Sequence, residues 1–238
     1  MTELSIAEKV AVVRDRMAEA CLQAGRPVSS VRLIAVTKYV EETRIAEAIA
    51  SGVREVGENH AQELTQKLTF FKLNGVTPHF IGQLQTNKIK YVCGKVALVH
   101  SVDRLPLALQ LEKRAAGLGI VQDILLQVNI GAENQKGGME TGMLMDLIGE
   151  VSAFPHLCIR GLMCVPPNVE PAEARRYFAR MRQLLSDAQS AYPALSLEEL
   201  SMGMSADYPE AILEGATMVR VGSGIFGARN YGQKPINQ

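Results

Sequence analysis

Short apolar runs alternate with longer amphipathic stretches along the chain. The stretches between the runs carry apolar residues at helical spacing, and the longest of them reads AEARRYFARMRQLLSDAQSAY. Strands that alternate with helices predict βαβ units and a parallel sheet. The apolar runs are predicted as strands at residues 32–38, 53–59, 79–83, 97–103, 123–130, 157–165, 199–205 and 218–226.

The element order favours an α/β fold of the (β/α)8 TIM barrel kind. Eight strands with seven intervening helices need one more helix, and the N-terminal stretch supplies it. Its apolar face consists of Ile6, Val10, Val13, Met17 and Cys21. The rival fold, an open doubly wound sheet, would favour a glycine-rich turn after the first strand, but that turn reads TKYVEE. We therefore expect a single domain over residues 1–238, with the N-terminal helix closing the ring.

Charge and cysteine usage narrow the possible partners. Lys plus Arg and Asp plus Glu each number 25, so the formal net charge is zero, and no block of like charge predicts a nucleic-acid or membrane partner. The four cysteines form no CxxC pair, so we expect no metal site, and buried free thiols in a reducing compartment. The N-terminus lacks the apolar run of a signal peptide. The sequence predicts a cytoplasmic monomer.

A lysine at the end of the first predicted strand is the first candidate for chemistry. In RLIAVTKYV, residues Ile34, Val36 and Lys38 share one face of the strand. If that face lines the barrel, Lys38 stands at the carboxyl ends of the strands, where barrel proteins carry their chemistry. A solvated lysine at a strand end is the more common alternative.

The C-terminal glycines suggest a phosphate site. Gly222, Gly224 and Gly227 have the GxGxxG spacing, but only residues 228–238 follow, which leaves no room for the rest of a dinucleotide fold. Barrels often hold a phosphate in the loops after strands 7 and 8. Ser205 ends strand 7, and Gly222 and Ser223 end strand 8, so these residues predict a phosphate cup. Alternatively, Asp207 and its neighbours only form a capping box for the next helix.

Two further side chains point to the same mouth. Arg220 shares strand parity with Gly222, so it should project inward, where a buried arginine needs a partner and usually finds an ion pair. Asn59 ends strand 2, where it could instead cap the next helix. His79 and His100 lie on predicted strands and are expected to be core residues. A lysine beside a phosphate cup fits an aldehyde-bearing phosphate, and pyridoxal 5′-phosphate (PLP) takes an Asp or Arg at its ring nitrogen.

Seven motifs in order carry a resemblance to a known family. They are AVTK, GENHAQE, HFIGQLQTNK, HSVDR, RGLMCV, LSMGMSADYPEAI and VRVGSGIFGARNY. With them the chain resembles the pyridoxal phosphate homeostasis proteins, the YggS/PROSC family, which are similar to the alanine racemase N-terminal domain. The resemblance implies PLP held as a Schiff base on Lys38, with further cofactor contacts from Asn59, Ser205, Arg220, Gly222 and Ser223. The family more often has tyrosine at His60 and threonine at Ser223.

The resemblance implies a PLP carrier that buffers or delivers the cofactor in vitamin B6 homeostasis, without robust catalysis. PLP-dependent apoenzymes or a regulatory protein are its implied partners. The alternative is an alanine-racemase-like enzyme, which would need a proton donor from a second, β-rich domain, whereas this chain ends soon after Phe226. An arginine at the ring nitrogen also opposes its protonation. A third possibility is a Schiff-base aldolase without PLP.

Overall fold

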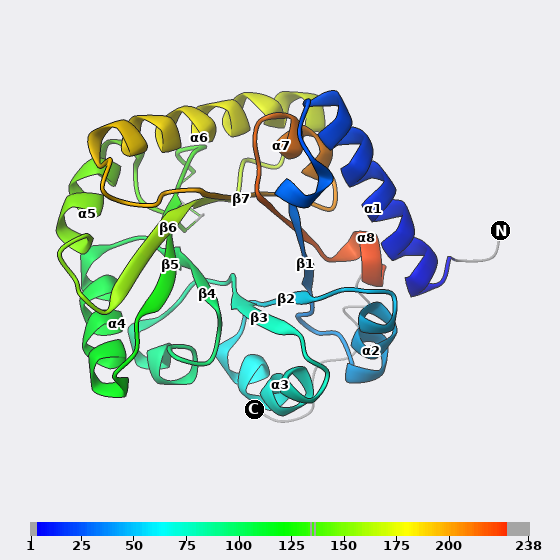
Figure 1. The fold of residues 1–238 in the computed structure, drawn as a ribbon, viewed down its shortest axis with the longest axis horizontal. Helices are drawn as coiled ribbons and strands as arrows, with labels where there is room; N and C mark the ends of the chain where they lie inside the picture. The colour runs from blue at the N-terminus through cyan, green and yellow to red at the C-terminus, as the bar shows by residue number, and fades with distance from the viewer. Residues whose placement is uncertain (1–3, 134, 136, 228–238) are drawn as a thin grey trace.

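Parallel strands close into a barrel in sequence order, with helices around it (Figure 1). The computed structural model describes residues 4–133, 135 and 137–227. β1 pairs with both β2 and β8, which closes the ring, confirms the predicted (β/α)8 barrel and excludes the open sheet. The strands are β1 Arg32–Val36, β2 Glu55–Glu58, β3 Thr77–Phe80, β4 Leu98–Val102, β5 Gln122–Val128, β6 Leu157–Cys164, β7 Glu199–Met204 and β8 Met218–Val221.

The connections are α-helical with one exception. Between β3 and β4 the chain forms the 3-10 helix η2 instead of the predicted α-helix. This connection contains Gly82 near its start and Gly94 near its end, and Gly94 has a left-handed φ of 76°. The α-helices are α1 Ile6–Gln23, α2 Glu42–Ala50, α3 Ala61–Leu73, α4 Leu105–Leu118, α5 Leu144–Val151, α6 Pro171–Ala191, α7 Tyr208–Leu213 and α8 Ser223–Phe226. The 3-10 helices are η1 Val28–Ser30, η2 Thr86–Tyr91 and η3 Thr141–Met143.

Helix α1 packs against α2, α7 and α8, so it covers the seam where the first and last strands meet (Figure 1). It begins with a capping box, in which the Ser5 hydroxyl accepts from the Glu8 N–H and the Glu8 carboxylate accepts from the Ser5 N–H. Its five predicted apolar residues are all buried. The expected N-terminal helix that closes the ring is thus confirmed.

The hydrophobic core has two shells. The outer shell lies between the strands and the helices, and it contains most of the buried apolar residues. The inner shell lies inside the barrel, and its members are Ile34, Leu98, Leu125, Met163 and Met218. Each fully buried side chain of this kind contributes roughly 1.5–3 kcal/mol. Because side chains alternate along a strand, Ile34 identifies the row of β1 that faces inward.

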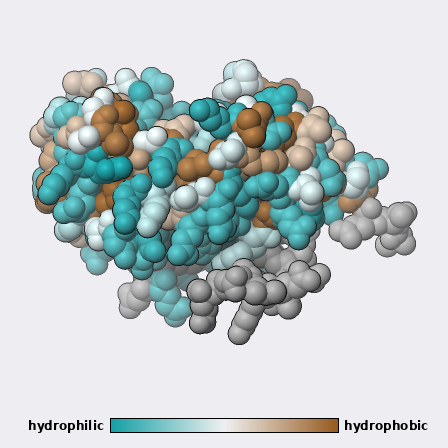
Figure 2. Space-filling model, turned by 90° about the horizontal axis from the view of Figure 1, so that it is seen from below, coloured by the Kyte–Doolittle hydropathy of each residue, from teal (hydrophilic) through white to brown (hydrophobic). Residues whose placement is uncertain are grey.

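The surface seen in Figure 2 is mostly hydrophilic, with hydrophobic residues in separate groups. No helix in the described part of the chain is long and apolar enough to cross a membrane. Part of the motif IFGARNY, from residue 228 onward, lies outside the described residues, as do both ends of the predicted domain 1–238.

Candidate functional site

Lys38 lies two residues after the end of β1, in a turn at the carboxyl end of the strand, and it is half-buried. The inward row of β1 runs from Ile34 through Val36 toward this lysine. A Cβ added at Gly222 would lie only 3.3 Å from the Cβ of Val36, so β1 ends against the loop that follows β8. The row predicted from strand parity therefore leads to the rim formed by the last strand.

A buried lysine of α3 holds the turn on one side of Lys38. The Lys67 side chain is 7% exposed, and its Nζ donates to the Thr37 carbonyl oxygen at 2.7 Å. The same ammonium donates to Glu58 at 3.0 Å and to Glu63 at 2.7 Å. Burial raises the pKa of Glu58 even though the Lys67 charge next to it acts in the opposite direction.

Tyr39 holds the turn on the other side of Lys38. Its backbone N–H donates to Glu63 at 2.6 Å, and its φ of 60° is left-handed, which is uncommon outside glycine. Its hydroxyl lies 2.9 Å from His60 Nε2, with the two rings 5.2 Å apart. The backbone is thus hydrogen-bonded immediately before and after Lys38. His60 has a defined role as the partner of Tyr39.

Asn59 follows β2 at the same end of the barrel, and its side chain does not cap a helix. His60 is the N-cap of α3, without a side-chain cap bond, so the capping alternative for Asn59 is wrong. The Asn59 Oδ1 is buried and has no hydrogen-bond partner among the described residues. Such an atom costs about 1–3 kcal/mol unless a partner reaches it. A Cβ at Gly82 would lie 2.1 Å from the Asn59 carbonyl oxygen, so this close approach requires glycine.

Arg220 lies inside the barrel wall, paired in register with Ile34 and 4% exposed. Its Nη1 donates to the Ser201 hydroxyl at 2.6 Å, and its Nη2 donates to the Cys164 carbonyl oxygen at 2.8 Å. Both acceptors are uncharged, so the expected ion pair is replaced by neutral partners. Burial lowers the pKa of this guanidinium, and the charges of Cys164 and Asp207 offset only part of that effect.

The loops after β7 and β8 meet at Ser205. The backbone N–H groups of Gly222 and Gly224 both donate to the Ser205 hydroxyl oxygen at 3.1 Å. Because this oxygen is the acceptor in both bonds, the hydroxyl proton stays available for another acceptor. Ser223 is exposed as the first residue of α8, beside these amides. The structure thus brings together the serines and glycines predicted for one cup.

The turn that carries Ser205 is tied by Asp207, which does not form the capping box that was the alternative. Asp207 precedes α7 without a side-chain cap bond to it. Its Oδ1 instead accepts from the backbone N–H of Met204 at 2.6 Å, and burial raises its pKa. The carboxylate therefore closes the turn in which Ser205 lies.

Comparison with known proteins identifies the family. The family model for the N-terminal domain of alanine racemase matches residues 13–230. A pyridoxal phosphate homeostasis protein of Aquifex aeolicus is 42% identical over 229 residues, which cover 96% of this chain and 100% of that protein. One of Pseudomonas aeruginosa is 43% identical over 230 residues, 96% of this chain and 97% of that protein. The chain belongs to the pyridoxal phosphate homeostasis protein family.

A solved structure agrees with this assignment. PipY of Synechococcus elongatus, solved with PLP bound, has a TM-score of 0.82 and 36% identity to this member of the pyridoxal phosphate homeostasis protein family. The match covers 94% of this chain and 100% of PipY. The resemblance drawn from the motifs is confirmed.

In this member of the pyridoxal phosphate homeostasis protein family, sequence reasoning missed the clamp around Lys38, which consists of the hydrogen bonds from Lys67 to the Thr37 carbonyl oxygen and from the Tyr39 N–H to Glu63. Its signal was present in GENHAQELTQK, where Glu63 and Lys67 are spaced i,i+4 on the helix that follows Asn59. A lysine on the buried face of an amphipathic helix requires an acidic partner, and Glu58 supplies the second one.

We expect Lys67→Met to lower the free energy of unfolding by about 3–5 kcal/mol at neutral pH. The variant leaves the Glu58 and Glu63 carboxylates without their cation, and removing one partner of a buried pair has a cost of that order. Lys72→Met, an exposed position on the same helix, is the matched control and should change stability by less than about 0.5 kcal/mol. Urea denaturation of both variants measures the difference.

The difference in unfolding free energy between the wild type and Lys67→Met should become smaller as the pH is lowered. Without Lys67 the pKa of Glu58 rises further above its ordinary value of 4.5. A carboxyl group whose pKa is raised by folding contributes stability that is fully present below 4.5 and is lost as the pH rises through the folded value. Denaturation at pH 7 and at pH 5 checks this sign. A gap that is equal or larger at pH 5 would contradict the assignment of Glu58.

Proposed function

We propose that this protein binds PLP covalently on Lys38 and buffers or delivers it within the cell, without robust catalysis of its own. The observation that carries the proposal is the clamped Lys38 turn, which ends β1 against the same loop that forms the serine and glycine cup. The names of the Aquifex and Pseudomonas relatives and the PLP in PipY support it.

The residues at the mouth fit the polar groups of PLP. When bound, PLP would supply an aldehyde, a phosphate and a pyridine nitrogen. The Ser205 hydroxyl suits a phosphate, because its oxygen accepts from the Gly222 and Gly224 amides and its proton stays available to donate. The buried Asn59 Oδ1 lacks a partner that a ligand hydroxyl could provide. Arg220 can only donate, so it suits an unprotonated ring nitrogen.

Each of these residues has one task. Lys38 must offer a neutral amine to bond the aldehyde carbon, and the hydrogen-bonded turn fixes where that amine begins. Ser205 and Ser223 orient the phosphate. Arg220 keeps a proton off the ring nitrogen, because its own positive charge lies next to it. That last task disfavours stabilisation of a carbanion and so favours a carrier over an enzyme.

The proposed setting is the cytoplasm, with PLP-dependent apoenzymes or a regulatory protein as partners and a monomer as the working form. None of the four cysteines, all within the described residues, forms a disulfide, and three of them are buried, as suits a reducing compartment. The second candidate function is a weak alanine-racemase-like activity, which the match to the alanine racemase N-terminal domain favours.

The purified protein, once loaded with PLP, should be yellow. Borohydride should bleach the colour and add the mass of reduced PLP to the peptide that contains Lys38. Lys38→Ala should abolish the colour and the added mass, while Lys113→Ala, an exposed lysine of α4, should change neither. Absorbance and peptide mass spectrometry measure both. A wild-type protein that stays colourless with excess PLP would refute the cofactor and favour the aldolase.

Replacing both cup serines should weaken PLP retention more than either single change. Each of Ser205→Ala and Ser223→Ala removes a hydrogen bond to a charged phosphate, worth roughly 1.5–3 kcal/mol, which corresponds to about tenfold or more in Kd. Ser190→Ala, an exposed serine of α6, is the control. Equilibrium dialysis against PLP gives the constants. If the double variant binds as tightly as the wild type, the cup is misplaced.

Alanine should not be racemised by the PLP-loaded protein at an enzyme's rate. Enzymes accelerate reactions at least ~10⁶-fold, and an arginine at the ring nitrogen withholds the proton that such catalysis uses. Chiral chromatography of L-alanine incubated with the protein, beside free PLP, measures racemisation. PLP transfer to an apoenzyme should be detectable in parallel. Fast turnover that disappears in Lys38→Ala would identify an enzyme.

A further inference from the structure

Polar side chains run through the inside of the barrel, where bulky apolar residues usually fill the layers. Toward the carboxyl ends of the strands, which we call the upper end of the barrel, Arg220 donates to the Ser201 hydroxyl at 2.6 Å. The same hydroxyl oxygen lies 3.0 Å from His100 Nδ1. Ser201 and His100 are completely buried, so water cannot replace either contact. The cofactor arginine is thus linked to a histidine of β4.

The polar contacts continue to the opposite end of the barrel. His100 Nε2 lies 3.0 Å from His79 Nδ1, with the two rings edge to face. His79 Nε2 lies 3.1 Å from the Glu55 carboxylate, which is ion-pair distance, although the contact does not meet hydrogen-bond geometry. Five residues from five strands therefore make one continuous column. They are Arg220, Ser201, His100, His79 and Glu55.

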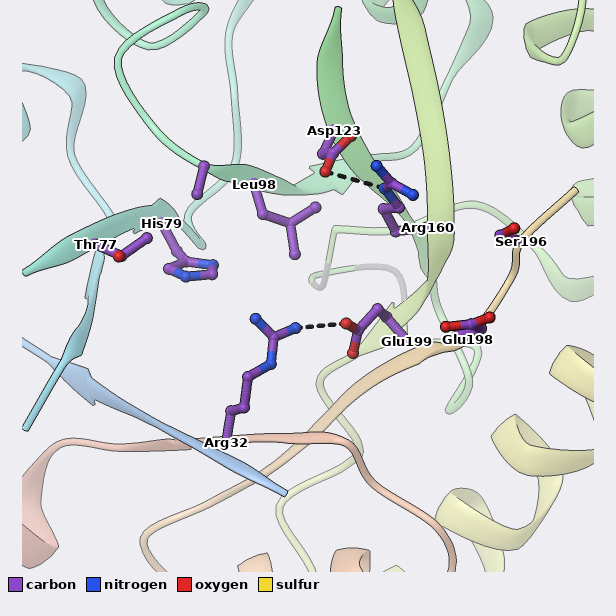
Figure 3. A pocket seen from close by; sticks show the side chains of 10 residues that line it. Arg32, Thr77, His79, Leu98, Asp123, Arg160, Ser196, Glu198 and Glu199 are labelled. Carbon is purple, nitrogen blue, oxygen red and sulfur yellow. Dashed lines mark hydrogen bonds and ion pairs between the residues drawn. The ribbon is translucent and has the colours of Figure 1, made fainter. Parts of the chain in front are cut away.

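The lower end of the column reaches a cavity at the amino ends of the strands. Figure 3 shows this cavity, of about 260 Å³, with Arg32 and His79 on its wall and Arg32 paired to Glu199. Arg32 also lies 3.5 Å from Glu55, which holds the carboxylate beside His79. The column thus joins the proposed PLP site to a solvent-accessible cavity at the far end of the barrel.

The chemistry of the two ends sets the direction of every bond between them. Arginine only donates, so the Ser201 oxygen accepts from Arg220, and a Ser201 hydroxyl that donates its proton to His100 Nδ1 matches a chain of bonds that ends on the accepting Glu55 carboxylate. His100 then carries its proton on Nε2 and donates to His79 Nδ1. His79 in turn carries its proton on Nε2, facing Glu55, which only accepts when ionised. The opposite direction would place a histidine lone pair 3.1 Å from a carboxylate oxygen.

We propose that Ser201, His100, His79 and Glu55 form a one-way hydrogen-bond relay that positions Arg220, so that the far end of the barrel tunes the PLP site. These are positioning residues, since they act on the cofactor only through Arg220. The effect on PLP rests on the proposed function, whereas the direction of the relay does not.

The charges along the relay agree with this direction. Burial lowers the pKa of His100 well below its ordinary value, and the neighbouring His79 and Arg220 lower it further, so His100 is neutral. Burial raises the pKa of Glu55, but the contact with His79 and the charge of Arg32 outweigh it, and the net pKa is lowered. Glu55 is therefore the ionised end of the relay.

Nitrogen NMR of the histidine rings tests the direction without PLP. In protein labelled with ¹⁵N-histidine, His100 should be neutral and protonated on Nε2 at pH 7, and His79 should carry a proton on Nε2. Glu55→Gln supplies an amide donor to His79, so it should allow the reverse direction and populate the Nδ1–H form of His100. Glu199→Gln, the other acidic partner of Arg32, should leave the wild-type pattern. A wild-type His100 that is charged or protonated on Nδ1 would overturn the relay.

PLP binding tests the consequence. His100→Phe fills the space but leaves Ser201 without its acceptor, and we expect PLP Kd to rise about tenfold, with a shifted pH profile of the bound-PLP absorbance. His100→Gln, which keeps an acceptor and a donor, should recover part of both. The surface variant His156→Gln is the control.

The outcomes separate the two proposals. If the wild type binds no PLP, the proposed function fails while the NMR result still decides the relay. If the wild type binds PLP and His100→Phe keeps the same Kd and pH profile, the relay is refuted and the function stands. If His100→Phe does not fold, the NMR comparison of the wild type with Glu55→Gln decides: a His100 that shifts toward the Nδ1–H form in Glu55→Gln supports the relay, and an unchanged His100 refutes it.

Discussion

A guanidinium buried inside the barrel is the constraint on which the rest of the interior depends. Arg220 keeps its charge and can only donate, so its neighbours must offer oxygen atoms. The Cys164 carbonyl is one, and the Ser201 hydroxyl is the other. A serine that accepts must find an acceptor for its own proton, which places His100 next. A barrel wall that could have been wholly apolar therefore carries a polar column down to Glu55.

In the parallel barrel, the alternation of side chains along each strand produces inward-facing rows that run from one end of the barrel to the other. Every second residue of a strand faces inward, about 7 Å from the last. On β1 the inward row runs from Arg32 at the lower cavity through Ile34 to Val36, and it continues toward Lys38. The row of β8 places Arg220 beside Ile34 in the same way. The mouth and the cavity are thus two ends of the same side-chain rows, with the apolar residues of the inner shell and the polar column between them.

Periodicity predicted what is local in the sequence. The eight strands, the face of β1 that carries Lys38 and the apolar face of α1 all follow from spacing, because burial imposes a period of two or of 3.6 residues. Spacing cannot show which distant groups meet. The clamp from Lys67 to the Thr37 carbonyl spans 30 positions, and the contact between His100 and Ser201 spans 101. These contacts depend on closure of the ring.

Short-range rules also failed where tertiary contacts outweighed them. Asp207 fits a capping signature, yet its carboxylate turns back to accept from the half-buried backbone N–H of Met204. Asn59 fits a capping signature too, but its buried Oδ1 has no hydrogen-bond partner among the described residues. Polar groups that leave their local partners are expected at functional sites. Both departures occur at the carboxyl ends of the strands, next to residues chosen from the sequence on independent grounds.

Binding a cofactor and using it in catalysis require different features of the barrel mouth. The mouth is rigid where it would grip PLP, since hydrogen bonds fix the backbone on both sides of Lys38 and tie Ser205 to two amides. Rigid donors strengthen binding because little freedom is lost when the ligand arrives. Catalysis needs something further, namely groups that favour the transition state over the bound state. In the proposed site Arg220, linked to His100 through the Ser201 hydroxyl, would place a fixed positive charge at the ring nitrogen, and such a group would stabilise the resting cofactor rather than a carbanion.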